Sequence, residues 1–205
     1  MNIQQYEINF WKQYLLLEKE FISTTLYVNL DAANYSTYSS AYVKLMLEIG
    51  SEIDNVMREM CNKTQESNIG DYAPILLCKY PDITNQVVKI KNNSILVIPF
   101  AGWNTSKPSI SLCFWNAYNA VKHNRIANYQ KASLENTIKA LAGLFILEMY
   151  RFYELYCAEQ DAFSSLPGTE SDLLILDKWD QHVRFTKVKS PYSLIDDENN
   201  QTRII

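Results

Sequence analysis

The sequence predicts an all-α fold, a bundle of four to five helices that carries a small β-hairpin insertion. Apolar side chains recur every three or four residues over several long segments, which is the period of a helix with one buried face. The 205-residue chain holds only five glycines and six prolines, and this scarcity suits long helices. At this length the simplest organisation is one domain with a sizeable core.

The N-terminal part predicts two amphipathic helices. The first is expected over about Gln4–Leu30, where aromatic and leucine residues repeat at helical spacing. The second is expected to begin at Ser36 or Thr37, both suitable caps, and to end near Met60. Gly50 lies inside the second helix, where glycine costs about 1 kcal/mol relative to alanine. We therefore expect another helix to pack closely at Gly50.

Residues 62–110 have a different character, rich in Asn, Ser, Gly, Pro and Asp, and are expected to be an insertion made mostly of loop. Val87–Ile90 and Ile95–Ile98 are short β-branched runs on either side of Asn92–Asn93. This arrangement predicts a small hairpin with a tight turn. The segment Tyr72–Tyr80 fits neither a helix nor a loop clearly.

Two further helices are predicted after the insertion. One covers Leu112–Arg125, with Ser109 or Ser111 as its N-cap, and the other covers about Ala132–Gln160. The last helix is apolar on two faces, which is typical of a central, mostly buried helix. The core is expected to include Ile49, Ile53, Leu141 and Phe145, with Gly143 at a helix crossing.

The predicted domain spans residues 1–190. Residues 191–205 are polar and charged for the most part, and we expect a disordered tail there. The N-terminus lacks a signal pattern, and the longest apolar run, Ala140–Leu147, is too short to span a bilayer. The sequence therefore predicts a soluble, cytoplasmic protein that does not enter membranes.

The composition argues against several classes of function. The net charge of −4 gives the whole molecule no general attraction for phosphate, although residues 100–158 are locally basic. Four widely spaced cysteines form no CxxC pair, and two histidines cannot complete a zinc site. No glycine-rich phosphate loop is present. We expect no metal and no cofactor.

One polar helix carries the residues most suited to chemistry. Asn116, Asn119 and His123 are three and four residues apart, so they share one helical face. Histidine titrates near neutral pH and serves as a general acid or base. Lys122 and Arg125 beside it suit an anionic substrate. The alternative is that His123 is a surface residue with no such task.

Two other residues have a functional and a purely structural interpretation. In the functional interpretation, Glu52 pairs with Lys122, Arg125 or His123 and orients that basic group. In the structural interpretation, Glu52 belongs to a solvated helix face. Tyr118, like Trp115 near it, would pack in the core or a dimer interface, or would stack on a base.

The order of four segments resembles the HEPN superfamily of small all-α bacterial and archaeal proteins. These segments are FWKQYLLLEKEF, YVKLMLEIGSEIDNVM, FWNAYNAVKHNR and SLENTIKALAGLFIL, and the resemblance covers about residues 6–156. It implies a helical bundle that usually dimerises. Many HEPN proteins are metal-independent ribonucleases in toxin–antitoxin or antiviral systems, and others are binding modules without activity.

The family's catalytic motif is an arginine, usually followed by a polar residue, with a histidine four to six residues after the arginine. Here Asn119 matches the polar residue and His123 matches the histidine, whereas the arginine positions hold Asn116, Ala117 and Tyr118. The family mechanism uses the arginine to stabilise negative charge developing at phosphorus.

The resemblance therefore implies a role for each polar residue of this helix. His123 would be the acid–base residue, Asn119 and Asn116 would position a phosphate, and Lys122 or Arg125 would neutralise charge in place of the arginine. The implied partners are a second copy of the chain, RNA or a nucleotide, and a protein such as an antitoxin. The competing hypothesis is a non-catalytic helical module for dimerisation or partner binding.

Overall fold

The computed structural model describes residues 1–158, 170–176, 193–196 and 201–204, and it is mostly helical. The helices are α1 (Ile3–Tyr6), the π-helix η1 (Glu7–Trp11), α2 (Lys12–Thr24), η2 (Ala32–Asn34), α3 (Ser40–Met60), α4 (Ile69–Lys79), η3 (Pro81–Asn85), α5 (Pro108–Ser111), α6 (Cys113–His123), α7 (Arg125–Asn128), η4 (Tyr129–Lys131) and α8 (Leu134–Ala158). The strands are β1 (Val88–Ile90), β2 (Leu96–Val97), β3 (Leu174–Leu176), β4 (Ser193–Asp196) and β5 (Gln201–Ile204).

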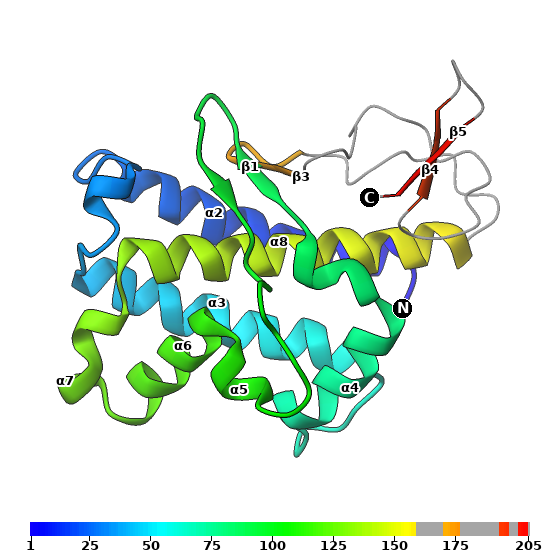
Figure 1. Cartoon of the computed structure of the whole chain (residues 1–205), viewed down its shortest axis with the longest axis horizontal. Helices are drawn as coiled ribbons and strands as arrows, with labels where there is room; N and C mark the ends of the chain where they lie inside the picture. The colour runs from blue at the N-terminus through cyan, green and yellow to red at the C-terminus, as the bar shows by residue number, and fades with distance from the viewer. Residues whose placement is uncertain (159–169, 177–192, 197–200, 205) are drawn as a thin grey trace.

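Helix α8 runs through the centre of the molecule and contacts α2, α3 and α6 (Figure 1). Every residue from Ala140 to Tyr150 is buried, which confirms the prediction of a central helix. The four predicted core residues are all completely buried, namely Ile49, Ile53, Leu141 and Phe145. A Cβ atom at Gly143 would lie 2.9 Å from the ring of Phe114 in α6, so Gly143 marks the α6–α8 crossing as expected.

The first predicted helix ends six residues earlier than Leu30, at Thr24 in α2. Hydroxyl groups satisfy the carbonyl groups that a helix end leaves without partners. Thr24 Oγ1 donates to the main-chain oxygen of Phe21 at 2.7 Å, and Thr25 Oγ1 donates to that of Ile22 at 2.7 Å. The apolar pattern alone did not show this stop.

The second helix begins later than predicted. Ser39, not Ser36 or Thr37, caps α3, because its side chain accepts a hydrogen bond from the main-chain nitrogen of Tyr42. The close packing expected at Gly50 is confirmed, since a Cβ atom there would overlap the ring of Tyr118 in α6.

Residues 62–110 contain more helix than expected. Helix α4 covers most of the ambiguous segment Tyr72–Tyr80, despite Pro74 within it. A capping box starts the helix: the Asn68 side chain accepts from the main chain of Gly70 at 2.8 Å, and the Asp71 carboxylate accepts from that of Asn68 at 2.8 Å. The polar residues that suggested loop at this point act as caps, so the prediction underestimated the helix content of residues 62–110.

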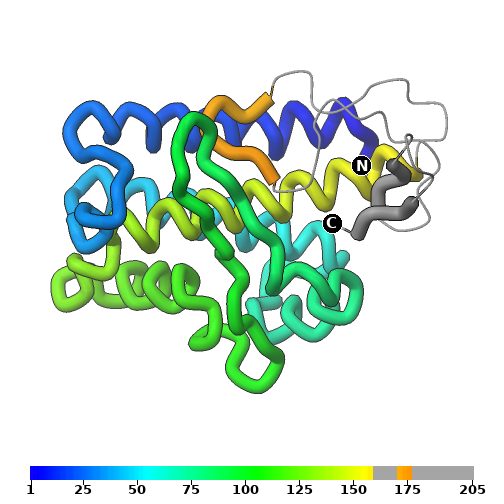
Figure 2. Tube along the Cα trace, turned by 45° about the horizontal axis from the view of Figure 1, so that its top comes forward, coloured from blue at the N-terminus to red at the C-terminus, as the bar shows by residue number. Residues whose placement is uncertain are grey.

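The predicted hairpin is confirmed. Strands β1 and β2 pair antiparallel, with Val88 opposite Val97. Strand β3, which the sequence analysis did not predict, adds to the other side of β1, and the two chain segments lie side by side in Figure 2. Buried Glu18 fixes the approach to β3 by accepting from the main-chain nitrogen of Asp172 at 2.8 Å and from the hydroxyl of Ser171.

The caps expected for the third helix are wrong. Helix α6 begins after Leu112 with no side-chain cap, and the short α5 precedes it. Ser109 and Ser111 both lie within α5, where Ser109 Oγ accepts from the Asn119 amide and Ser111 Oγ accepts from the main chain of Asn104.

Part of the tail that was expected to be disordered forms two short strands. Strands β4 and β5 pair antiparallel, with Ser193 opposite Ile204. The residues of these strands include β-branched and apolar types that favour extended structure. Residues 191–192, 197–200 and 205 lie outside the described residues. None of the described helices is both long and apolar enough to cross a membrane.

Candidate functional site

Helix α6 presents one buried face and one polar face. Its buried residues lie along the face that meets α3 and α8, at successive spacings of one, two, one and three: Phe114, Trp115, Ala117, Tyr118 and Val121. The remaining positions hold the polar residues that the sequence analysis selected. The hydrophobic pattern of α6 therefore decides which of its residues can meet a ligand.

The chain turns sharply after α6 at Asn124, whose backbone leaves the helical region. The Asn124 side chain then accepts from the main-chain nitrogen of Ala127 at 3.2 Å and starts α7. The hydroxyl of Tyr129, just after α7, forms a hydrogen bond of 2.6 Å with the hydroxyl of Ser40 in α3. The ring of Tyr129 also meets that of Tyr38 edge-on, with 6.0 Å between centroids. These contacts fasten the turn to the start of α3.

The predicted triad lies on α6 but is not equally accessible. Asn116 and His123 are exposed, whereas Asn119 is half-buried. Asn119 Nδ2 donates to Ser109 Oγ at 3.0 Å, so the amide is engaged within the protein. The second histidine, His182, lies outside the described residues.

Of the two interpretations of Tyr118, core packing and stacking on a base, the burial of its side chain supports core packing. Its side chain is 4 % exposed and its ring covers Gly50, so it has no free face for a base. Trp115 is likewise 4 % exposed, and the two rings pack 5.0 Å apart. Both aromatic residues belong to the core. The Nζ atom of Lys122 lies over the Tyr118 ring, 5.3 Å from its centroid, and makes a cation–π contact with it.

Glu52 does not pair with a basic group of α6 or α7. Its carboxylate accepts from Asn55 at 3.2 Å, and no ion pair to Lys122, Arg125 or His123 forms within the described chain. Burial raises the pKa of the Glu52 carboxyl group, and the hydrogen bond from Asn55 opposes this rise. The interpretation in which Glu52 orients the basic residues is therefore not supported.

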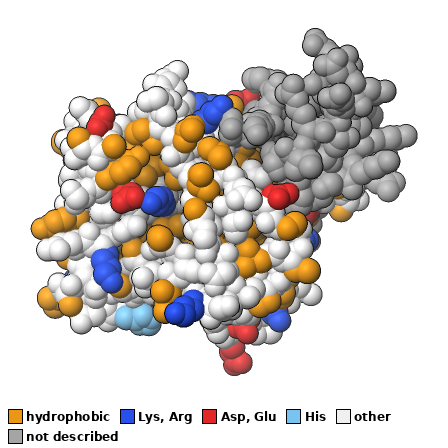
Figure 3. Space-filling view, in the orientation of Figure 1, with side chains coloured by type: hydrophobic (Ala, Val, Ile, Leu, Met, Phe, Trp, Pro, Cys, Tyr) orange, Lys and Arg blue, Asp and Glu red, His pale blue; other side chains and the backbone are white. Residues whose placement is uncertain are grey.

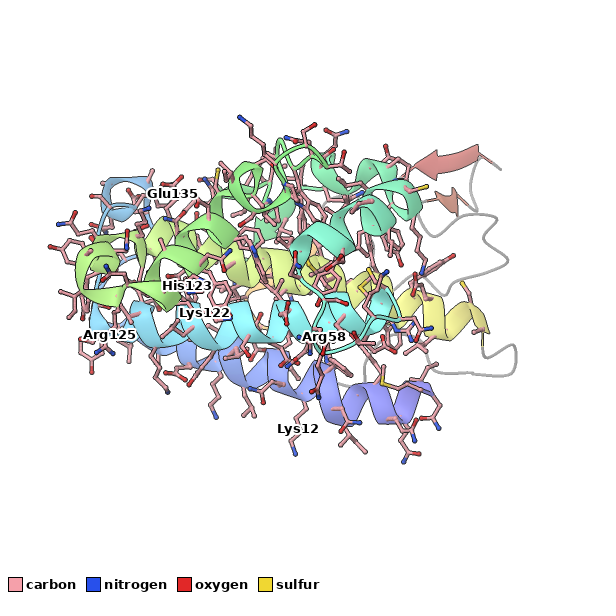
Figure 4. All side chains as sticks on the ribbon, turned by 90° about the horizontal axis from the view of Figure 1, so that it is seen from below. Lys12, Arg58, Lys122, His123, Arg125 and Glu135 are labelled. Atoms are coloured by element: carbon pink, nitrogen blue, oxygen red, sulfur yellow. The ribbon has the colours of Figure 1, made fainter. Side chains whose placement is uncertain are left out.

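The turn between α6 and α7 presents a basic surface, and no acidic residue lies near it in the sequence. No Asp or Glu occurs from Ile83 to Leu134. We call the exposed residues Lys122, His123, Arg125 and Lys131 the basic elbow. Figure 4 shows Lys122, His123 and Arg125 at the same end of the molecule, and Figure 3 shows histidine and basic side chains along the lower edge of the described surface. Within the described residues, no ion pair neutralises any member of the elbow.

A groove lies beside the elbow, between α3 and α7. Its volume is about 670 Å³, and it is lined by Ser40, Val43, Lys44, Leu47, Arg125, Ile126 and Tyr129. Of these residues, the sequence analysis selected Arg125 alone. The α3 residues are about eighty positions from those of α7, so no local pattern could have brought them together.

The sequence analysis also missed Glu148, a fully buried carboxyl group in α8. Burial raises the pKa of Glu148 to about 8; the Tyr6 hydroxyl lowers the pKa in part, and the carboxylates of Glu52 and Glu59 raise it further. The Tyr6 hydroxyl donates to the main-chain oxygen of Glu148 at 2.7 Å. A carboxylate directly after the apolar run Ala140–Leu147 was the available sequence signal.

Comparisons with known proteins leave the site to be interpreted from its geometry. A scan against protein-family models, a search of curated proteins and a search of solved structures each find no match. Within the described residues, no group of three or more His, Cys, Asp or Glu side chains could hold a metal ion.

Proposed function

We propose that this chain is a HEPN-like protein that engages single-stranded RNA at the basic elbow. The observation that carries the proposal is the exposed set Lys122, His123, Arg125 and Lys131 within a stretch that contains no acid. Cations without ion-pair partners attract phosphate, and their counterions are released on binding. The net charge of −4 makes such a local surface necessary, because the molecule as a whole repels RNA.

The same site would support metal-independent cleavage of RNA. His123 is exposed at the end of α6, where it could exchange a proton with the attacking 2′-hydroxyl or with the leaving oxygen. Lys122 and Arg125 would neutralise charge on the phosphate, and exposed Asn116 would hydrogen-bond to it. Asn119 would take part only after leaving Ser109. A homodimer would supply the second acid–base group, and the toxin–antitoxin or defence setting follows from the resemblance alone.

RNA binding is tested by fluorescence anisotropy with a labelled single-stranded RNA of twelve nucleotides. Lys122→Ala and Arg125→Ala should each weaken binding and reduce the slope of log K against log salt by about 0.7, the value for one phosphate contact on a single strand. Lys12→Ala is the matched control, because exposed Lys12 lies on α2, away from the elbow in Figure 4. Absence of binding by the unaltered protein would refute the proposal.

A non-catalytic partner-binding module is the second candidate function. It is favoured by the burial of Tyr118 and by the Asn119 amide, which already has a partner. Large apolar side chains are also strongly exposed, with Leu26 82 %, Tyr27 88 % and Ile126 91 % exposed. Exposed apolar groups of this size are typical of protein contacts. A protein partner such as an antitoxin would cover them without any need for His123.

A further inference from the structure

We propose that the groove between α3 and α7 binds one nucleoside monophosphate unit, with the base on its apolar lining and the phosphate on Arg125. The unit would come from a free nucleotide or from one position of a single-stranded RNA. The second source rests on the proposed function, whereas the first does not. The groove is distinct from the polar face of α6 that the sequence analysis selected.

The size and lining of the groove suit a nucleotide. Its volume of about 670 Å³ lies within the range of roughly 300–1,000 Å³ that holds small ligands. Val43, Leu47, Ile126 and Tyr129 supply apolar and aromatic surface. Ile126 is 91 % exposed, so a base seated beside it would remove a large apolar side chain from water.

The charged and polar groups of the groove suit the rest of the nucleotide. Arg125 has no ion-pair partner among the described residues, and a guanidinium group binds phosphate through two parallel hydrogen bonds. Lys44 is a second cation; it is bonded to Glu20 at 2.7 Å but remains 58 % exposed. The Ser40 and Tyr129 hydroxyls share one hydrogen bond, which leaves one O–H group able to donate to a base or a ribose.

The dimensions favour a nucleotide over an acidic peptide. A helical peptide needs a groove long enough for anchors at i, i+4 and i+7. Here roughly two turns of α3, from Ser40 to Leu47, and residues 125–129 form the whole lining, so the groove is no longer than the span of those three anchors alone. A compact ligand with one flat apolar part and one anionic part matches this surface better.

The position of the groove connects it to His123. Arg125 follows His123 by two residues, so their Cα atoms are at most roughly 7.6 Å apart, twice the spacing of consecutive residues. A phosphate held by Arg125 would therefore bring the next phosphodiester of an RNA strand close to His123. The groove would select the nucleotide, and the elbow would hold the strand beside it.

Isothermal titration calorimetry tests the inference with adenosine monophosphate, inorganic phosphate and a single-stranded RNA of six nucleotides. Leu47→Trp should fill the groove and Arg125→Ala should remove its phosphate ligand. Each change should weaken binding of adenosine monophosphate at least about tenfold. Lys12→Ala, on the exposed face of α2, should leave binding within about twofold of the unaltered protein. Thermal unfolding of each variant would confirm that the fold is retained.

The outcomes distinguish failure of the groove inference from failure of the RNA-binding proposal. Weaker binding of inorganic phosphate than of adenosine monophosphate supports the groove, because the base must then contribute. Adenosine monophosphate binding without RNA binding also supports the groove, with a free nucleotide as its ligand, and refutes the RNA proposal. RNA binding that depends on Lys122 and Arg125 but not on Leu47, without any binding of adenosine monophosphate, overturns the groove alone. No binding of adenosine monophosphate, or equal binding of adenosine monophosphate and inorganic phosphate, overturns the groove as well.

Discussion

Gly50 of α3 and the ring of Tyr118 of α6 lie in direct contact, with no space for a Cβ atom between them. The contact brings α6 close to α3 and buries one face of α6. The opposite face, with Asn116 and His123, is consequently left in solvent. The close approach of the two helices therefore determines which residues of α6 are available to a ligand.

We expect Gly50→Ala to destabilise the protein despite the better helix propensity of alanine, which favours it by about 1 kcal/mol. Overlap with the Tyr118 ring should cost roughly 1–3 kcal/mol beyond that gain. Urea unfolding monitored by circular dichroism would measure the change. In a Tyr118→Ala background the overlap is gone, so Gly50→Ala should then be neutral or stabilising. Equal effects in both backgrounds would show that the two residues do not interact.

Leu141→Ala should reduce the free energy of unfolding by roughly 2–5 kcal/mol, because the side chain is completely buried in the central helix. Leu26→Ala is the matched control, since Leu26 is 82 % exposed and its loss should change stability by no more than about 0.5 kcal/mol. Denaturant titration of both variants checks the prediction. A cost below about 1 kcal/mol for Leu141→Ala would mean that α8 does not pack as described.

Glu148 should make the protein less stable as pH rises. The ordinary pKa of 4.5 is raised to about 8 in the folded state, chiefly by burial. Between these values the folded protein holds a proton that the unfolded chain has lost. The contribution of this group to the free energy of unfolding should therefore be largest below pH 4.5, should fall by several kcal/mol, roughly, between pH 4.5 and 8, and should be lost above pH 8.

Glu148→Gln keeps the shape of the side chain and removes its titration. The variant should show a flatter dependence of melting temperature on pH between 5 and 9 than the unaltered protein, measured by scanning calorimetry. Glu52→Gln is the control, because Glu52 is only half-buried and its pKa is also raised by burial, so it should flatten the curve less. Identical curves for Glu148→Gln and the unaltered protein would refute the role of Glu148.

RNA cleavage, under the proposed function, should survive EDTA and be lost in His123→Ala. No metal is required if His123 exchanges the protons, and acid–base groups contribute roughly a hundred- to ten-thousand-fold to rate. Gel analysis of labelled RNA with both proteins gives the measurement. Lys12→Ala should cleave as the unaltered protein does. Absence of cleavage, together with partner binding unchanged in His123→Ala, would favour the non-catalytic module.

A symmetric homodimer is expected in solution, because a second copy of the chain would remove the exposed side chains of Leu26 and Tyr27 from water. The buried rings of Trp115 and Tyr118 cannot contribute to its interface, so any contact through α6 must use the polar face of that helix. Light scattering at tens of micromolar would measure the mass. A monomer under these conditions would contradict the prediction.

The sequence by itself determined the elements whose evidence is local. Helical spacing of apolar residues indicated the buried faces of α3 and α8, and Asn92–Asn93 between two β-branched runs indicated the hairpin. These features depend on neighbours within a few residues. Helix ends were less predictable. Thr24 and Ser39 end and begin their helices through side-chain hydrogen bonds, and several nearby residues have side chains that could make the same bonds.

Only the tertiary structure decided which polar residues meet solvent and which are engaged. Tyr118 is buried because Gly50 lies opposite it on another helix, and Asn119 is held by Ser109 from another element. The groove joins Ser40, Lys44 and Leu47 to Arg125, Ile126 and Tyr129 across about eighty residues of chain. Such contacts depend on how helices pack, and helix periodicity fixes a buried face without specifying the residue that it will meet.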